Sequence, residues 1–113
     1  KLHEGFRKKR IKRLNDALRR GEGSGNTVVV TLGVKAKGDV FLSLAAQAVA
    51  GFSSFSKDND PHGEHDFGAF DLQGEKLFWK IDYFDGSLSF HSPDPANQNL
   101  TNRVLTIMLA SEY

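Results

Sequence analysis

The densest group of side chains that could do chemistry lies between residues 58 and 66, with the sequence Asp-Asn-Asp-Pro-His-Gly-Glu-His-Asp. Neutral imidazoles and carboxylates bind zinc, manganese or iron, and they can exchange protons at neutral pH. Two residues separate the histidines, so both could reach one ion from a bent loop. The candidate metal or acid–base residues are His62, Glu64, His65 and Asp66, with His91 as a further candidate from a later loop.

A structural role competes with this hypothesis. The spacing matches no strong metal-binding motif, and the sequence has no His-Glu-x-x-His pattern. Asp60, Glu64 and Asp66 could instead accept hydrogen bonds from loop amides and hold the entry to the following strand. We favour the structural role, so no cofactor is expected; a divalent metal belongs only to the catalytic alternative.

A second group of candidate residues is basic and lies near the start of the chain. The first 20 residues contain nine Lys and Arg against two acidic residues, whereas residues 21–113 contain six against twelve. The net charge of +1 therefore conceals a strong asymmetry. Residues 6–20 contain neither Gly nor Pro, and Ile11, Leu14 and Leu18 recur with helical spacing, which predicts a helix. Its candidate binding residues are Arg7, Lys8, Lys9, Lys12, Arg13, Arg19 and Arg20.

These cations have three alternative uses. They could follow the phosphates of a nucleic acid, dock on an acidic protein surface, or pack against the acidic remainder of their own chain. No base-reading motif follows them. The glycine-rich segment 21–25 predicts a short flexible joint, which divides the chain into a basic helix with its joint (1–25) and an α+β domain (26–113).

Composition excludes several classes of site. Cysteine is absent, which rules out disulfides, thiolate metal sites and cysteine nucleophiles. The longest uncharged apolar stretch is interrupted by Gln47, serines and Gly51, so it is a poor membrane span, and the basic start lacks the apolar run of a signal peptide. A cytoplasmic protein without a membrane partner is therefore expected.

Periodicity predicts the elements that position these residues. Residues 27–34 are predicted as a strand, and residues 40–50 as a helix capped by Asp39. Residues 67–72 and 75–84 are predicted as strands joined by a turn at Gln73-Gly74, and residues 87–91 as a third strand after an Asp85-Gly86 turn. Residues 99–113 are predicted as a central helix. The order is helix, strand, helix, three antiparallel strands, helix. The predicted fold class is thus α+β, with a mostly antiparallel sheet of about four strands and helices packed on it. Aromatics occupy both faces of strand 75–84, so helices are expected on one face, with the other partly covered or used for binding.

Specific segments of the chain resemble a small bacterial family of unknown function. They are residues 58–68, Phe78-Trp-Lys-Ile-Asp-Tyr83, Ser92-Pro-Asp-Pro95, residues 101–110 and Glu112-Tyr113. The resemblance extends from Asn15 to the last residue. Members resemble stand-alone proteins often encoded on plasmids and mobile elements, and the family assigns no catalytic residues. The resemblance implies an accessory protein of mobile DNA, and proteins of that setting often counter host defence by binding.

Two functional hypotheses remain. The preferred one is a small non-enzymatic binding protein that engages a macromolecule, either nucleic acid or an acidic protein surface, with its basic helix. Inhibition of restriction or CRISPR defence would be one such activity. The alternative is a metal-dependent hydrolase or nuclease built on the loop from His62 to Asp66.

Overall fold

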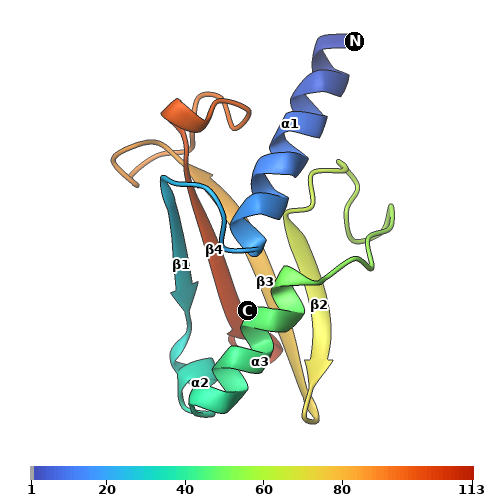
Figure 1. The fold of residues 1–113 in the computed structure, drawn as a ribbon, viewed down its shortest axis with the longest axis vertical. Helices are drawn as coiled ribbons and strands as arrows, with labels where there is room; N and C mark the ends of the chain where they lie inside the picture. Colours follow the sequence, from blue (N-terminus) through green and yellow to red (C-terminus); the bar gives the residue numbers. More distant parts are fainter. Residues whose placement is uncertain (1) are drawn as a thin grey trace.

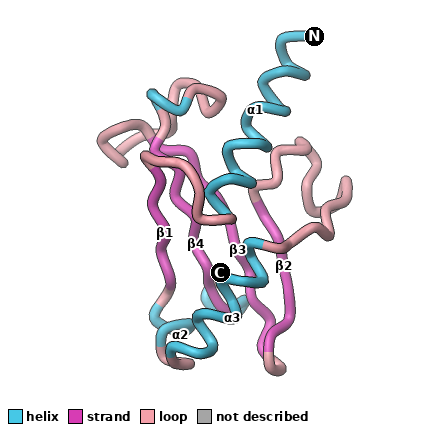
Figure 2. Tube along the Cα trace, in the orientation of Figure 1, coloured by secondary structure: helices cyan, strands magenta, loops and turns pink. Residues whose placement is uncertain are grey.

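The computed structural model describes residues 2–113; Lys1, one of the basic residues near the start, lies outside this range. The elements are the helix α1 (Leu2–Arg19), the strand β1 (Asn26–Val30), the helices α2 (Leu32–Lys35) and α3 (Asp39–Ala50), the strands β2 (Phe67–Leu72) and β3 (Glu75–Phe84), the 3₁₀ turn η1 (Gln98–Leu100), the strand β4 (Asn102–Leu109) and the 3₁₀ turn η2 (Ala110–Glu112). Figures 1 and 2 show the helices in front of a single twisted sheet.

The sheet has four strands in the order β1-β4-β3-β2. β1 runs parallel to β4, with Val28 opposite Leu105, whereas β4 with β3 and β3 with β2 are antiparallel. The predicted α+β class with a mostly antiparallel four-stranded sheet is confirmed. The predicted hairpin of 67–72 and 75–84 is also confirmed, including its Gln73-Gly74 turn.

One face of the sheet is covered by α1 and α3, and the hydrophobic core lies between these helices and the sheet (Figure 1). Side chains alternate across a strand, so every second residue of β3 enters this core. Leu77 and Trp79 are fully buried there, against Phe41, Ala45 and Val49 of α3. Burial of these large apolar side chains is the main stabilising contribution to the fold.

The opposite face of the sheet carries the alternate set of residues. Phe78 and Phe67 lie on it and are half-buried, and the Tyr113 ring packs edge-on against Phe78 with ring centroids 5.4 Å apart. Lys80 pairs with Asp82 at 3.2 Å on this face. The expectation that helices cover one face of β3 and that the other face is only partly covered is therefore confirmed.

The segment predicted as a C-terminal helix, residues 99–113, is instead the central strand β4 with a 3₁₀ turn on each side. The prediction of a central position was right, but the helical assignment was wrong. Residues 104–109 are apolar except for Thr106, so the sequence lacks the regular alternation that distinguishes a half-buried strand from a buried helix. β-branched Val104, Thr106 and Ile107 are the residues that favour a strand here.

The predicted third strand, 87–91, is also wrong. Asp85 does not begin a two-residue turn; its Oδ1 accepts hydrogen bonds from the amides of Ser87 and Ser89, at 3.2 Å each, and folds the segment into an irregular loop. A single bridge between Phe84 and His91 remains of the expected pairing. The Ser87 hydroxyl and these amides lower the pKa of Asp85.

Two further boundaries differ from the predictions. The first strand ends at Val30, and α2 occupies residues predicted as strand, because the Glu112 carboxylate accepts a 2.9 Å bond from the Gly33 amide and holds the turn. A Cβ on residue 33 would lie 2.6 Å from that carboxylate, so a larger residue there would displace the Glu112 side chain. Asp39 is the first residue of α3, not its cap; Gly38 precedes the helix.

Within residues 2–113, no helix is long and apolar enough to cross a membrane.

Candidate functional site

The basic helix α1 lies on the sheet through one narrow side. Ile11 and Leu18 are buried on this side, and between them Asn15 is completely buried. The Asn15 amide donates to the Tyr83 hydroxyl at 2.8 Å and to the Glu64 carbonyl at 3.0 Å, while its oxygen accepts from Arg103 Nε at 2.9 Å. One asparagine therefore joins α1 to β3, β4 and the loop before β2.

Some of the predicted binding cations are used for this attachment. Arg19 is buried; it donates to the carbonyls of Val49 and Phe52, forms a 2.7 Å ion pair with Asp16, and lies over the Trp79 ring. Arg7 pairs with Asp94 at 2.8 Å, between two partly exposed side chains. Arg10, which was not among the predicted binding residues, donates to the Ala96 carbonyl at 2.7 Å. Arg19 is thus a structural residue, and Arg7 is held at the surface of its own domain.

The other predicted cations point away from the sheet. Helical geometry, at 100° per residue, places Lys9, Arg13 and Arg20 opposite the buried side, and Lys12 flanks them. We call Lys9, Lys12, Arg13 and Arg20 the basic stripe. Among the described residues the stripe forms one ion pair, between Arg20 and Glu22 at 3.8 Å. Asp16 lies one turn from Lys12 and Arg20, but its carboxylate is paired with Arg19 and His65. Lys8 is exposed beside the stripe, and Phe6 on the outward side is 70 % exposed.

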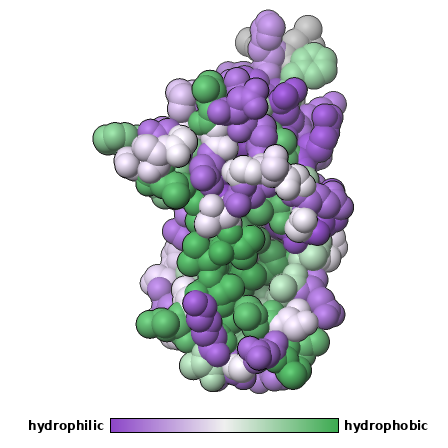
Figure 3. Space-filling view, turned by 60° about the vertical axis from the view of Figure 1, so that its left-hand side comes forward, coloured by the Kyte–Doolittle hydropathy of each residue, from purple (hydrophilic) through white to green (hydrophobic). Residues whose placement is uncertain are grey.

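Figure 3 shows the consequence for the surface: the part of the molecule that contains α1 is hydrophilic, whereas the lower part carries a broad apolar area. The start of α1 projects beyond the sheet (Figure 1). A partner can therefore reach the stripe without moving any other element.

The loop with the His, Glu and Asp cluster is held by its own side chains. The buried Asp60 accepts bonds from the amides of Glu64 and His65, at 3.0 and 3.2 Å. Glu64 Oε1 accepts from the Tyr83 hydroxyl at 3.0 Å. Burial raises the pKa of Tyr83, so this phenol stays protonated and remains a donor.

His65 is used to bind the loop to α1. Its Nδ1 lies 2.9 Å from Asp16 Oδ1, and its ring stacks on Phe55 with centroids 3.6 Å apart. Burial opposes ionisation of Asp16, but hydrogen bonds from Arg19 and His65 outweigh it and lower the pKa of Asp16. The structural role proposed for this loop is thus carried by Asp60, Glu64 and His65.

The predicted metal ligands do not converge. Within residues 2–113 there is no group of three His, Asp or Glu side chains that could hold a metal ion. His62 is exposed, Glu64 and His65 have the partners described above, and His91 Nδ1 lies 2.8 Å from the Ser92 carbonyl. This arrangement does not favour the catalytic alternative.

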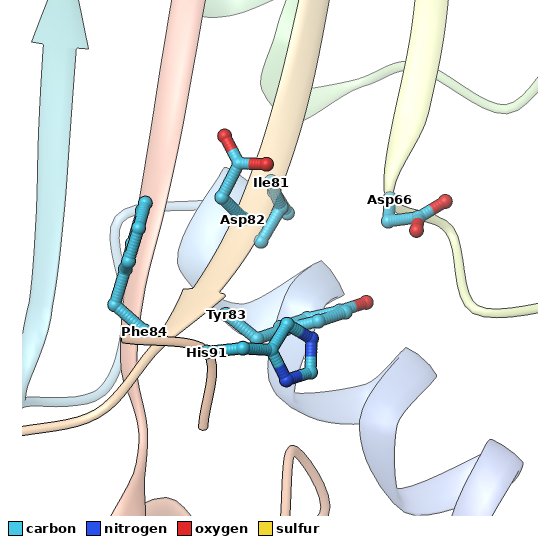
Figure 4. A pocket seen from close by; sticks show the side chains of 6 residues that line it. All are labelled: Asp66, Ile81, Asp82, Tyr83, Phe84 and His91. Carbon is cyan, nitrogen blue, oxygen red and sulfur yellow. The ribbon is translucent and has the colours of Figure 1, made fainter. Parts of the chain in front are cut away.

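Asp66 and His91 are brought to one cavity of about 290 Å³, lined by Asp66, Ile81, Asp82, Tyr83, Phe84 and His91 (Figure 4). The cavity forms because β3 continues past Phe67, the first residue of β2. The Ile81 amide donates to the Asp66 carbonyl, and the next hydrogen bond along this side of β3 is from the Ser92 amide to the Tyr83 carbonyl. In Figure 4 the Asp66 carboxylate points away from the His91 ring. The two groups therefore line the cavity without forming an acid–base pair.

Burial, with the charges of Glu64 and Asp60, raises the pKa of Asp66. A raised pKa means that the folded state binds the proton more tightly than the unfolded state. The carboxylate thus destabilises the fold at neutral pH, and this penalty vanishes below the ordinary Asp pKa of about 3.9.

We expect Asp66→Asn to raise the free energy of unfolding at pH 7 and to have no such effect at pH 3. Urea unfolding at the two pH values measures the difference. Asp71→Asn, at an exposed position of β2, is the matched control and should change little. A lower stability of Asp66→Asn at pH 7 would show that the carboxylate is stabilising and contradict the expectation.

Sequence reasoning did not identify the buried polar centre formed by Asn15, Tyr83 and Arg103. One signal was available: Asn15 lies four residues after Ile11 and three before Leu18, so it interrupts the apolar side of the helix. A polar residue at such a position requires buried partners. Those partners come from β3 and β4, which are 68 and 88 residues away in sequence.

Comparison with known proteins gives one match. Residues 30–112 match a family described as protein of unknown function (DUF3768). No curated protein and no solved structure matches the chain significantly. The match confirms the resemblance to a family of unknown function. It covers β2, β3, β4, α2, α3 and the cluster loop, while α1 and all of β1 except Val30 lie before the matched residues. Since it spans well over half of the chain, this protein belongs to the DUF3768 family.

Proposed function

We propose that this protein is a small non-enzymatic binding protein that engages an anionic macromolecule with the basic stripe of α1. The observation that carries the proposal is that the cations of α1 form two sets, one bound to groups of the same domain and the other turned towards solvent. Arg7, Arg10 and Arg19 bind groups of the same domain, whereas the stripe on the opposite side forms a single long ion pair among the described residues, between Arg20 and Glu22.

The side of α1 on which the stripe lies supports this interpretation. If the helix existed only to neutralise its own acidic domain, its cations would lie on the docked side. Most of that side is instead apolar or uncharged, with Ile11, Asn15 and Leu18 buried. The exposed Lys9, Arg13 and Arg20 and the half-buried Lys12 repel one another, and an external polyanion relieves this repulsion and releases its own counterions.

A nucleic-acid backbone is the anion that fits the stripe best. Lys9 and Arg13 are one turn apart, so their side chains can contact neighbouring phosphates along a strand. Phe6 lies one turn before Lys9 on the outward side and offers an exposed ring on which an unpaired base can stack. Inhibition of a host defence complex, which is frequent among accessory proteins of mobile DNA, would be one use of such binding.

We expect the triple variant Lys9→Gln, Arg13→Gln, Arg20→Gln to bind DNA or RNA at least tenfold more weakly than the unmodified chain at low salt. The slope of log K against log salt should fall by roughly 2–3, because each lost phosphate contact removes about 0.7–0.9. Fluorescence anisotropy with a labelled 30-mer, single-stranded and duplex, at two salt concentrations measures both quantities.

The matched control is Lys35→Gln, Lys57→Gln, Lys76→Gln, which removes the same charge from exposed positions outside α1. This variant should retain binding within about threefold. Equal loss in both variants would indicate a non-specific charge effect. Absence of binding by the unmodified chain at low salt would eliminate nucleic acid and leave an acidic protein surface as the partner.

A further inference from the structure

The exposed edge of β1 is suited to backbone pairing with a strand of another chain. β1 is one of the two outer strands of the sheet and pairs with β4 on one side. The Thr31 amide bonds to Ile107, so Thr31 and every second residue before it direct their backbone groups towards β4. The alternate residues Asn26, Val28 and Val30 consequently direct their N–H and C=O groups outward.

This edge lacks the features that normally protect an outer strand. Residues 24–34 contain no charged residue and no proline, in a chain of which 26 % is charged. Natural edge strands usually carry charges, prolines or bulges that prevent pairing with another chain. Here the flanking side chains are exposed and apolar: Val28 is 55 %, Val29 41 % and Leu32 81 % exposed.

The surrounding surface extends this apolar edge. Figure 3, turned so that the β1 side comes forward, shows a continuous apolar area below the hydrophilic part. The accessible surface is 6940 Å² for 12.5 kDa. A compact monomer of this mass exposes about 6,200 Å². The excess, to which the projecting start of α1 also contributes, is close to the roughly 800 Å² that one partner buries in a standard interface.

We infer that β1 pairs in antiparallel orientation with β1 of a second copy of this chain. The outward groups are symmetric about Val28, so in a two-fold pair Val28 lies opposite its own copy and Asn26 lies opposite Val30. Each of these three opposed pairs exchanges two backbone hydrogen bonds. The result is a continuous eight-stranded sheet whose helices all lie on one face.

A second copy suits this edge better than an acidic or basic partner. The two-fold contact is isologous, so a charge at residue 28, on the axis, would face a like charge of the other copy. The absence of charges from residues 24–34 removes that repulsion, and Val28 gains a cross-strand apolar neighbour. The pairing is independent of the nucleic-acid binding proposed above, since α1 contributes no group to it.

Sedimentation equilibrium across protein concentrations from about 1 to 300 µM tests the pairing. The unmodified chain should sediment as a dimer at the upper end, and Val28→Lys should be monomeric at every concentration. Val40→Lys is the matched control: Val40 is 74 % exposed on α3 and takes no part in the strand pairing, so this variant should dimerise as the unmodified chain does. A monomer at 300 µM, or a Val28→Lys variant that still dimerises, would overturn the inference.

A second measurement tests the register and does not depend on Val28→Lys folding. Because the chain has no cysteine, Val28→Cys introduces a single thiol that lies opposite its copy at a distance suited to a disulfide. Mild oxidation should give a covalent dimer rapidly. Val29→Cys, one residue along at an exposed position, faces residue 27 of the other copy and should cross-link much more slowly. Equal rates for the two variants would refute the proposed register.

Discussion

Arg103→Met is expected to lower the free energy of unfolding by about 3 kcal/mol, the largest effect of any substitution considered for this protein. Arg103 is completely buried on β4. Its guanidinium donates to Asn15 Oδ1 at 2.9 Å, to Gln98 Oε1 at 3.0 Å and to the Pro95 carbonyl, and it lies over the Tyr83 ring. Methionine fills most of the volume but leaves three buried or half-buried acceptors without a donor, each costing about 1–3 kcal/mol.

The energetics of Arg103 depend on these neutral acceptors because no carboxylate of the described residues forms an ion pair with it. Burial lowers the pKa of Arg103, although an arginine remains charged at any physiological pH. A lysine presents a compact ammonium that cannot span acceptors on three segments. Arg103→Lys should therefore recover only part of the lost stability.

Urea unfolding followed by circular dichroism measures the effect. The control is Arg13→Met, an arginine of the basic stripe that is exposed, and its change should stay within about 0.5 kcal/mol. If Arg103→Met changed the free energy of unfolding by less than 1 kcal/mol, the buried polar centre would not be a stabilising feature.

Gly68→Ala is expected to lower the free energy of unfolding by about 2–3 kcal/mol through the addition of one methyl group. Gly68 pairs with Trp79 across the β2–β3 hairpin, and the indole lies over the glycine. A Cβ at this position would approach Trp79 Cε2 to 2.7 Å and Phe52 Cζ to 2.9 Å, with Trp79 Nε1 closer still. Trp79 is fully buried and edge-packed on Phe52 and Phe55, so it cannot move aside without disturbing the core.

Gly5→Ala provides a control of opposite sign. Gly5 lies in α1, where an added Cβ meets nothing within 4 Å, and alanine favours helix over glycine by up to about 1 kcal/mol. Thermal unfolding of the two variants should shift in opposite directions from the unmodified chain. A Gly68→Ala variant as stable as the unmodified chain would mean that the indole has room to shift.

The local elements that carry their own signal were predictable. The β2–β3 hairpin combines alternating residues with a Gln73-Gly74 turn, in which both residues have positive φ. The helix from residue 39 to 50 combines helical spacing with a glycine at each end. In both segments the side chains of the segment itself determine the structure, so no distant contact is needed.

Elements that depend on distant contacts were not predictable. Residues 104–109 are apolar except for Thr106, and such a run is compatible with a buried helix or a buried strand until β1 and β3 are there to pair with it. The Asp85-Gly86 sequence predicted a tight hairpin. The Asp85 side chain instead accepts local amides, because the central place beside β3 is taken by β4.

For the candidate site, the sequence by itself determined the chemistry available: an excess of cations at one end, carboxylates and histidines in one loop, and no thiol. Only the tertiary structure decided how that chemistry is used. It assigned Arg7 and Arg19 to the domain, left Lys9, Arg13 and Arg20 in solvent, and placed Lys12 half-buried beside them. It also committed His65 to Asp16 and Phe55. The physical reason is that charge and residue type are local properties, whereas burial and hydrogen-bond partners depend on segments up to 88 residues apart in the chain.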